Sequence, residues 1–200
     1  MTATRPTAAT GLEALVDDYI QWMRPAREDE LSQFRTVRTD EDAISSAALA
    51  RNPRTGKKHS HQRRIPQPSL EKSKSRLVKH LSPVRSTKSF QELIELINHL
   101  IRPIDRVGEL CVYDTALRIG ARLGREPEKV YVHAGTRDGI RKLDSDLANR
   151  ETIEMDELPV PIRKLKPCEA EDFLCVYKDY LGNLRESPGA VSRRPRTSGC

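Results

Sequence analysis

Aromatic side chains are scarce in this 200-residue chain, where Phe, Trp and Tyr together make up 4% of the residues. Apolar residues as a whole make up 36% and charged residues 32%. This composition is polar but can still form one core, which we expect to be built mainly from aliphatic side chains. The length fits one domain, or one domain with tails.

Long apolar runs are missing too, and no window has enough consecutive apolar residues to cross a bilayer. The N-terminus, MTATRPTAATGLEAL, lacks the apolar segment of a secretory signal. None of the four cysteines forms a CxxC pair, and Cys111 and Cys175 fall in apolar helical patterns that are typical of reduced, buried thiols. These absences predict no membrane partner and a location in the cytoplasm.

Familiar catalytic and cofactor motifs are absent as well. The chain contains no GxSxG, P-loop, GxGxxG or HExxH sequence. His59 and His61 form an HxH pair, but no second group of ligands is spaced for a metal ion. We therefore predict no metal site and no cofactor, and the sequence favours a non-enzymatic role.

Positive charge, by contrast, is concentrated in one stretch. The formal net charge of the chain is +6, but residues 51–88 contain twelve Lys and Arg and a single acid, Glu71, so they carry +11 and the rest of the chain −5. Residues 51–68 are rich in turn formers and predict an exposed loop. A helix capped by Ser69 is expected to follow and to run to about Leu81.

The loop and one face of this helix are the predicted contacts with the phosphate backbone of a nucleic acid. The residues expected to make them are Lys57, Lys58, Arg63, Arg64, Lys72, Arg76 and Lys79. An acidic protein partner would explain the same pattern, and so would a charged surface that contacts only solvent.

Apolar residues at helical spacing predict an all-α fold, an irregular bundle of roughly six helices. Thr39, Ser89 and Thr136 are predicted N-caps. Gly124 is predicted to be the C′ residue that follows the helix ending at about residue 123. Pro25 and Ser82-Pro83 are expected to end helices. The expected helices span residues 11–23, 40–50, 69–81, 89–102, 108–123, 136–147 and 168–181.

The predicted organisation has four parts. Residues 1–50 form N-terminal helices, residues 51–88 the basic loop and helix, residues 89–182 a helical core with a hairpin, and residues 183–200 a disordered tail. We expect the N-terminal helices and the region 89–181 to share one core.

Residues 96–124, LINHLIRPIDRVGELCVYDTALRIGARLG, predict two helices joined by a tight turn. Ile104, Val107 and Gly108 follow the hydrophobic-x-Gly-hydrophobic-Gly turn of the helix-hairpin-helix motif, with Arg106 in place of the first glycine. The segment thus resembles that motif, which occurs in DNA-repair enzymes and other DNA-binding proteins.

The resemblance implies that backbone amides at the start of the second helix, beside Gly108, bind a phosphate. Arg102 and Arg106 would add Coulomb attraction. The alternative is an αα-hairpin that only packs two apolar faces together.

Residues 113–116 and 122–124 also resemble a DNA glycosylase superfamily that uses this hairpin. Tyr-Asp-Thr-Ala and Arg-Leu-Gly stand here where that family often has Val-Asp-Thr-His and Arg-Leu-Gly. The resemblance implies that Asp114 is a catalytic carboxylate. The alternative is an ordinary i,i+4 ion pair between Asp114 and Arg118.

Three hypotheses follow from the sequence. The preferred one is a non-enzymatic nucleic-acid-binding protein that contacts phosphates through the basic segment and the hairpin. The others are a glycosylase-like repair enzyme that uses Asp114, and a helical protein-interaction or scaffold domain.

Overall fold

The computed structural model describes residues 11–182 and 184 and confirms the all-α prediction. The strands in this part of the chain are β1 (Val130–Tyr131) and β2 (Thr152–Ile153), which pair antiparallel. The predicted disordered tail lies outside the described residues, apart from residue 184. No helix within residues 11–182 is long and apolar enough to cross a membrane.

The chain divides into two compact units. We call residues 1–25 and 129–200 the terminal unit, and residues 26–128 the central unit. These boundaries differ from those expected from the sequence, because residues 129–181 share an apolar core with the first helix. Periodicity within a helix shows which face is buried but not which other helix covers it.

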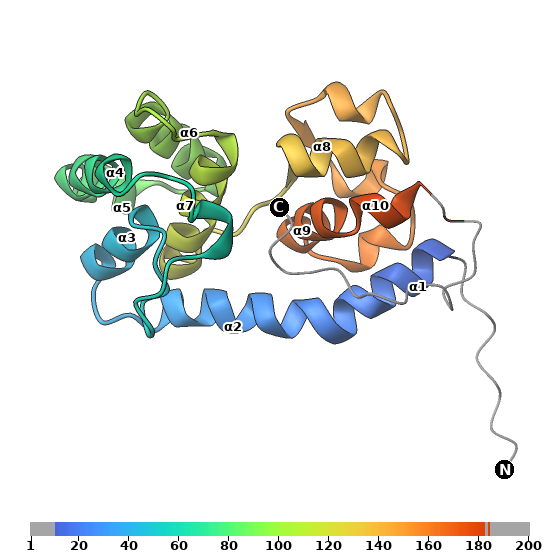
Figure 1. Ribbon diagram of the computed structural model, residues 1–200, viewed down its shortest axis with the longest axis horizontal. Coiled ribbons are helices and arrows are strands. Elements are labelled where there is room, and N and C mark those ends of the chain that lie inside the picture. Colours follow the sequence, from blue (N-terminus) through green and yellow to red (C-terminus); the bar gives the residue numbers. More distant parts are fainter. Residues whose placement is uncertain (1–10, 183, 185–200) are drawn as a thin grey trace, which may run out of the picture. The chain divides into compact units, whose positions relative to one another are not determined.

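The terminal unit is built on helices from both ends of the chain (Figure 1). It contains α1 (Gly11–Asp18), a π-helical turn at Tyr19–Met23, α8 (Ala134–Arg141), α9 (Pro167–Val176) and α10 (Lys178–Leu181). Three 3₁₀ turns complete it, at Leu147–Asn149, Met155–Glu157 and Ile162–Lys164.

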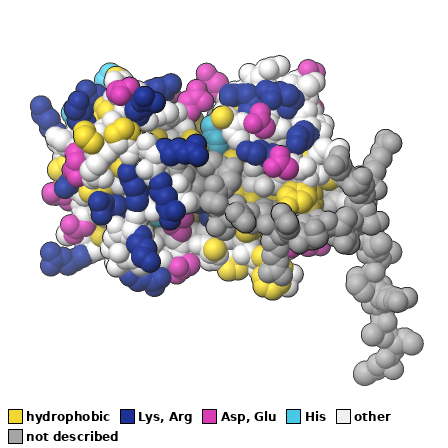
Figure 2. Space-filling model, viewed as in Figure 1, with side chains coloured by type: hydrophobic (Ala, Val, Ile, Leu, Met, Phe, Trp, Pro, Cys, Tyr) yellow, Lys and Arg dark blue, Asp and Glu magenta, His cyan; other side chains and the backbone are white. Residues whose placement is uncertain are grey.

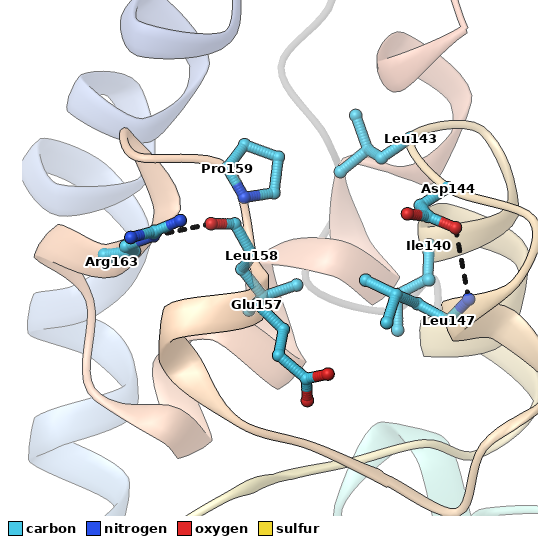
Figure 3. A pocket seen from close by; sticks show the side chains of 8 residues that line it. All are labelled: Ile140, Leu143, Asp144, Leu147, Glu157, Leu158, Pro159 and Arg163. Carbon is cyan, nitrogen blue, oxygen red and sulfur yellow. Dashed lines mark hydrogen bonds between the residues drawn. The ribbon is translucent and has the colours of Figure 1, made fainter.

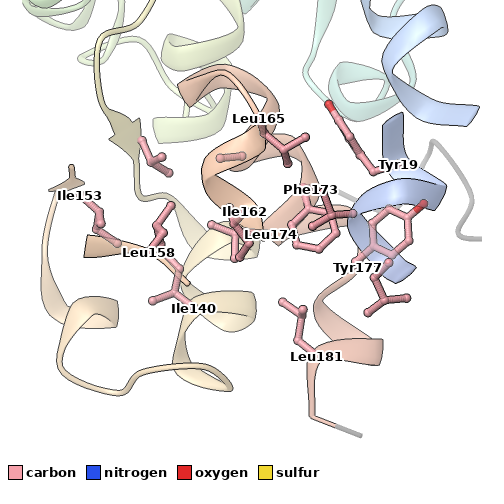
Figure 4. Close-up of a cluster of buried hydrophobic side chains, with 14 of the residues drawn as sticks. Tyr19, Ile140, Ile153, Leu158, Ile162, Leu165, Phe173, Leu174, Tyr177 and Leu181 are labelled. Carbon is pink, nitrogen blue, oxygen red and sulfur yellow. The ribbon is translucent and has the colours of Figure 1, made fainter. Parts of the chain in front are cut away.

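Figure 4 shows the apolar core of the terminal unit. Tyr19, which follows α1, meets Phe173 of α9 edge to face, with 6.0 Å between the ring centroids. Phe173 in turn stacks on Tyr177 at 5.1 Å. Aromatic rings therefore hold α1 against α9, although the composition predicted a mainly aliphatic core.

The central unit contains most of α2 (Arg24–Arg35) and five further helices. These are α3 (Asp40–Ala48), α4 (Gln67–Lys79), α5 (Leu81–Ser86), α6 (Phe90–Ile101) and α7 (Glu109–Leu123). The helix α7 packs against α3 and α6, and ten of its residues are buried. It is therefore the centre around which the other helices of this unit are arranged.

Several predicted caps are confirmed. Thr39 accepts a hydrogen bond from the backbone N–H of Asp42, and Ser89 accepts one from that of Glu92. Gly124 ends α7 with a left-handed φ of 68°, which favours glycine because it has no Cβ.

Other predicted helix boundaries were wrong. Pro25 does not end a helix, because the chain stays helical from α1 through the π-helical turn into α2, and Pro83 lies in the first turn of α5. Proline fits at position 83 because the first N–H groups of a helix have no intrahelical partner. Ser69 and Thr136 lie inside α4 and α8, which begin after Pro66 and His133.

The cysteine prediction holds only in part. Cys111 is a buried free thiol, and Cys168 is free and partly exposed. For Cys175 the structure bears out the predicted burial.

Candidate nucleic-acid interface

A row of cations follows one exposed face of α4. Lys72, Arg76 and Lys79 are exposed, at the i, i+4, i+7 spacing that places residues on one side of a helix. The opposite side, with Leu70 and Leu77, is buried in the central unit. Lys72 and Lys79 make no side-chain hydrogen bond or ion pair among the described residues, so their charges face solvent.

Arg76 joins this row to the hairpin. Its Nη1 donates to the backbone oxygen of Leu100, at the end of α6, at 2.9 Å. Leu100 lies only two residues before Arg102, which begins the turn between α6 and α7. The cationic face of α4 and the predicted phosphate-binding turn are therefore neighbours.

The turn presents Gly108 to solvent. Gly108 is the N-cap of α7, with φ −91° and ψ 177°, and a Cβ added there would have no neighbour within 4 Å. Arg102 braces the turn from within, since its Nη1 donates to the carbonyl oxygen of Val107 at 3.1 Å. Gly108 and Glu109 are both exposed, so α7 begins at the surface, where helix-opening amides can bind an anion.

Arg106 has a φ of 65°, in the left-handed region that glycine adopts at little cost. It occupies the position where the helix-hairpin-helix pattern has its first glycine, so this backbone conformation agrees with the resemblance even though the residue type does not. Its side chain is 74% exposed, and the nearest carboxylate is that of Asp105, 3.9 Å away.

The basic loop is placed elsewhere on the central unit. Lys58 donates from Nζ to the backbone oxygen of Ile65 at 2.8 Å and is partly buried, so it helps to hold the loop together. Lys57, Arg63 and Arg64 are exposed and make no ion pair or side-chain hydrogen bond with any described residue.

The loop is tied to the middle of α7. Gln62 accepts a hydrogen bond from Arg118 Nη1 at 2.9 Å, ten residues along α7 from Gly108. That distance is about 15 Å along the helix axis, so the loop and the turn do not form a single contact point. The helix α4, which follows the loop in sequence and reaches the turn through Arg76, links the two.

Asp114 lies inside the central unit. Its side chain is 4% exposed, and its Oδ2 lies 3.6 Å from Arg118 Nη2. This is the i,i+4 ion pair that the sequence offered as the alternative to a catalytic role. No hydrogen bond to Asp114 Oδ2 is found within residues 11–182.

Arg118 also contacts other polar side chains in the interior of the central unit. Its Nε donates to Glu30 Oε1 at 3.1 Å, and Glu30 also lies 3.3 Å from His59 Nδ1. Sequence reasoning missed Glu30 and Gln62, which are 88 and 56 residues away from Arg118. No local pattern marks residues that meet only in the folded chain.

Two pKa values shift in this cluster. Burial raises the pKa of Glu30, but the charges of Arg118, Arg27 and His59 outweigh it and lower that pKa to about 2. Burial and the charge of Arg118 lower the pKa of His59 to about 4. His59 is therefore neutral at pH 7 and does not add to the charge of the basic loop.

The net charge of the chain resides in the central unit. Residues 26–128 contain 20 of the 35 lysines and arginines and 14 of the 29 aspartates and glutamates, so this unit carries +6 and the terminal unit none. Figure 2 shows lysine and arginine side chains spread over the visible face of the central unit.

A small pocket of about 230 Å³ lies in the terminal unit (Figure 3). Its floor is apolar, with Ile140, Leu143 and Leu147, and its charged groups are engaged nearby. Arg163 Nε donates to the oxygen of Leu158 at 2.6 Å, and Asp144 accepts from the N–H of Leu147 at 3.2 Å.

No group of three or more His, Cys, Asp or Glu side chains among the described residues is arranged to hold a metal ion. No protein-family model, no curated protein and no solved structure matches this chain.

Proposed function

We propose that the central unit binds the phosphate backbone of a nucleic acid without catalysing a reaction. The observation that carries the proposal is the hydrogen bond from Arg76 to Leu100, which joins the cationic face of α4 to the exposed turn before α7. Cations that have no acidic partner can replace the counterions of a polyanion.

The two parts of this surface contribute differently. Lys72, Arg76 and Lys79 supply Coulomb attraction that does not depend on base sequence. The turn adds backbone N–H donors at the start of α7, but Glu109 stands in its first turn and repels a phosphate. We therefore expect α4 to supply most of the affinity and the turn to orient the strand.

Asp114 takes no part in this proposal as a catalytic group. A carboxylate that attacks or activates a substrate has to reach it, whereas Asp114 is 4% exposed and pairs with Arg118. We assign it to the interior of the central unit, where it helps to hold Arg118.

Binding of labelled single-stranded and duplex oligonucleotides in rising salt tests the proposal. We expect the logarithm of the association constant to fall linearly with the logarithm of the salt concentration. Replacing Lys72, Arg76 and Lys79 together by Gln should reduce the slope by about 3, at roughly 0.9 for each lost contact.

The matched control removes three charges from the terminal unit, by replacing Lys129, Arg141 and Lys164 with Gln. These residues are at least 46% exposed, and the slope should not change. The proposal is wrong if the chain shows no affinity at low salt, or if both triple variants change the slope equally.

A further inference from the structure

A polar groove lies in the central unit between α2, α3 and the turn that follows α3. Its volume is about 670 Å³, within the range of pockets that hold small molecules. Residues from three segments line it, among them Gln33 of α2, Leu49 after α3 and Arg54 in the turn. Neither the cationic face of α4 nor the turn at Gly108 contributes to it.

Gln33, one of the residues that line this groove, has an unsatisfied acceptor. The residue is 8% exposed, and its Nε2 donates to Asp29 Oδ2 at 2.8 Å. Its Oε1 accepts no hydrogen bond from any described residue. A buried amide oxygen without a donor is costly, and an N–H group of a ligand would satisfy it.

Three guanidinium groups line the same groove. Arg38 is exposed and makes no ion pair or side-chain hydrogen bond within the described part of the chain. Arg51 donates one hydrogen bond, from Nη1 to the backbone oxygen of Gly56. Arg54 forms an exposed ion pair with Asp29, in which Nη2 lies 3.5 Å from Oδ2. Each guanidinium has five N–H donors, so several remain for an anion.

The groove also has apolar and acidic parts. Val37, Leu49 and Pro53 are among its lining residues and provide surface for the faces of a flat ring. Asp29 and Asp42 reduce the net charge of the lining to +1. An inorganic anion would use only the arginines, whereas a ligand with a ring, N–H donors and a negative group uses the whole lining.

We infer that this groove binds one nucleotide, with an N–H of its base donating to Gln33 Oε1 and its phosphate accepting from the arginines. Residues 51–56 of the groove lead directly into the basic loop, so the nucleotide could be an unpaired one of a bound strand. The assignment of the nucleotide to a bound strand rests on the proposed function. A free nucleoside monophosphate has the same base and phosphate groups and would fit the groove equally.

Titration of the ¹⁵N-labelled full chain with nucleoside 5′-monophosphates tests the inference by NMR, with ribose 5-phosphate as the control ligand. We expect saturable shifts of the Gln33 side-chain amide, and affinity at least about tenfold higher than for the sugar phosphate, because the base supplies the contact to Oε1. Equal binding of both ligands, or no saturation below about 10 mM, overturns the inference.

Variants separate the two kinds of contact. Gln33→Met removes the acceptor at similar volume, and we expect it to weaken mononucleotide binding about tenfold. Arg38→Gln should weaken it as well. Lys88→Gln removes the same charge outside the groove and should leave mononucleotide binding as in the wild type. If Gln33→Met does not fold, the amide shifts of the wild-type chain still decide the question.

Oligonucleotide binding measured in parallel distinguishes this inference from the proposed function. A chain that binds mononucleotides but no strand supports the groove and contradicts the proposed function. A chain that binds strands but no mononucleotide contradicts the groove and leaves the cationic surface supported. Competition between an unpaired strand and a mononucleotide identifies the strand as the source.

Discussion

At the scale of single residues, Arg118 holds together the interior of the central unit. It lies 3.1 Å from Glu30 and 3.6 Å from Asp114, and its own side chain is 3% exposed. Removal of this buried arginine would leave the negative charges of both carboxylates without their positive partner.

We expect Arg118→Met to destabilise the protein by about 3–5 kcal/mol, the usual cost of leaving a buried charge unpaired. Chemical denaturation followed by circular dichroism measures this change. Lys72→Met removes an exposed cation and should cost less than about 0.5 kcal/mol. Similar values for the two variants would show that the buried pairs contribute little.

The stability of the protein should fall as the pH is lowered from about 6.5. His59 has a pKa of about 4 in the folded chain and about 6.5 when unfolded, so between these values the unfolded state binds more protons. Stability therefore decreases on acidification, by about 3 kcal/mol for a shift of this size.

The low pKa of Glu30, about 2, extends this loss below pH 4.5, where the unfolded carboxyl begins to take up a proton. His59→Gln should remove the decrease between pH 6.5 and 4 and keep the decrease below pH 4.5. Unfolding in denaturant at a series of pH values checks both parts, and an unchanged profile in the variant would contradict the assignment to His59.

At the scale of elements, Gly139 allows α8 and α9 to approach closely. A Cβ at this position would lie 2.0 Å from the backbone oxygen of Leu174 in α9, closer than real contacts permit. The backbone of α9 would have to move to accept any side chain.

We expect Gly139→Ala to destabilise the terminal unit by about 2–3 kcal/mol, because the added methyl overpacks the contact. Gly108→Ala is the control, since a Cβ there has no neighbour within 4 Å and Ala in place of Gly at an N-cap costs less than about 1 kcal/mol. Thermal unfolding of both variants tests the difference, and equal losses would show that α8 and α9 can separate without cost.

At Arg106, in the turn between α6 and α7, a positive charge is present at a position where glycine would be more stable. Its left-handed φ of 65° costs a residue with a side chain on the order of 1 kcal/mol. Arg106→Gly should therefore raise the free energy of unfolding by about 1 kcal/mol while it lowers the salt slope of oligonucleotide binding by about 0.9. A loss of stability in this variant would show that the Arg106 side chain holds the turn.

The elements were predictable to different degrees. Thr39, Ser89 and Gly124 act on their own helix ends, so the sequence identified them. Pro83 was misread because proline both ends helices and opens them, and the neighbouring residues do not decide between the two. Gly139 could not be recognised, since the oxygen that excludes a side chain belongs to Leu174, 35 residues away.

At the scale of the whole molecule, charge is divided unequally between the two units. The central unit carries the whole net charge of +6, and most of its exposed cations lie on α4, in the basic loop and at the turn before α7. We therefore expect a polyanion to be attracted to the central unit rather than to the terminal unit.

We expect an oligonucleotide to slow amide hydrogen exchange within residues 57–108 of the full chain and to leave residues 129–182 unchanged. Mass spectrometry of peptides from the exchanged protein measures both regions in one sample, so the terminal unit is its own control. Protection mainly in residues 129–182 would contradict the proposed surface.

The sequence by itself determined the all-α fold, most helices and the concentration of positive charge at 51–88, because periodicity, caps and charge are properties of neighbouring residues. Only the tertiary structure decided that the chain forms two units, that Arg76 meets the end of α6, that Asp114 is buried beside Arg118, and that Gln33 lines a groove. These depend on contacts between distant segments, which form when helices bury their apolar faces together and which no local pattern records.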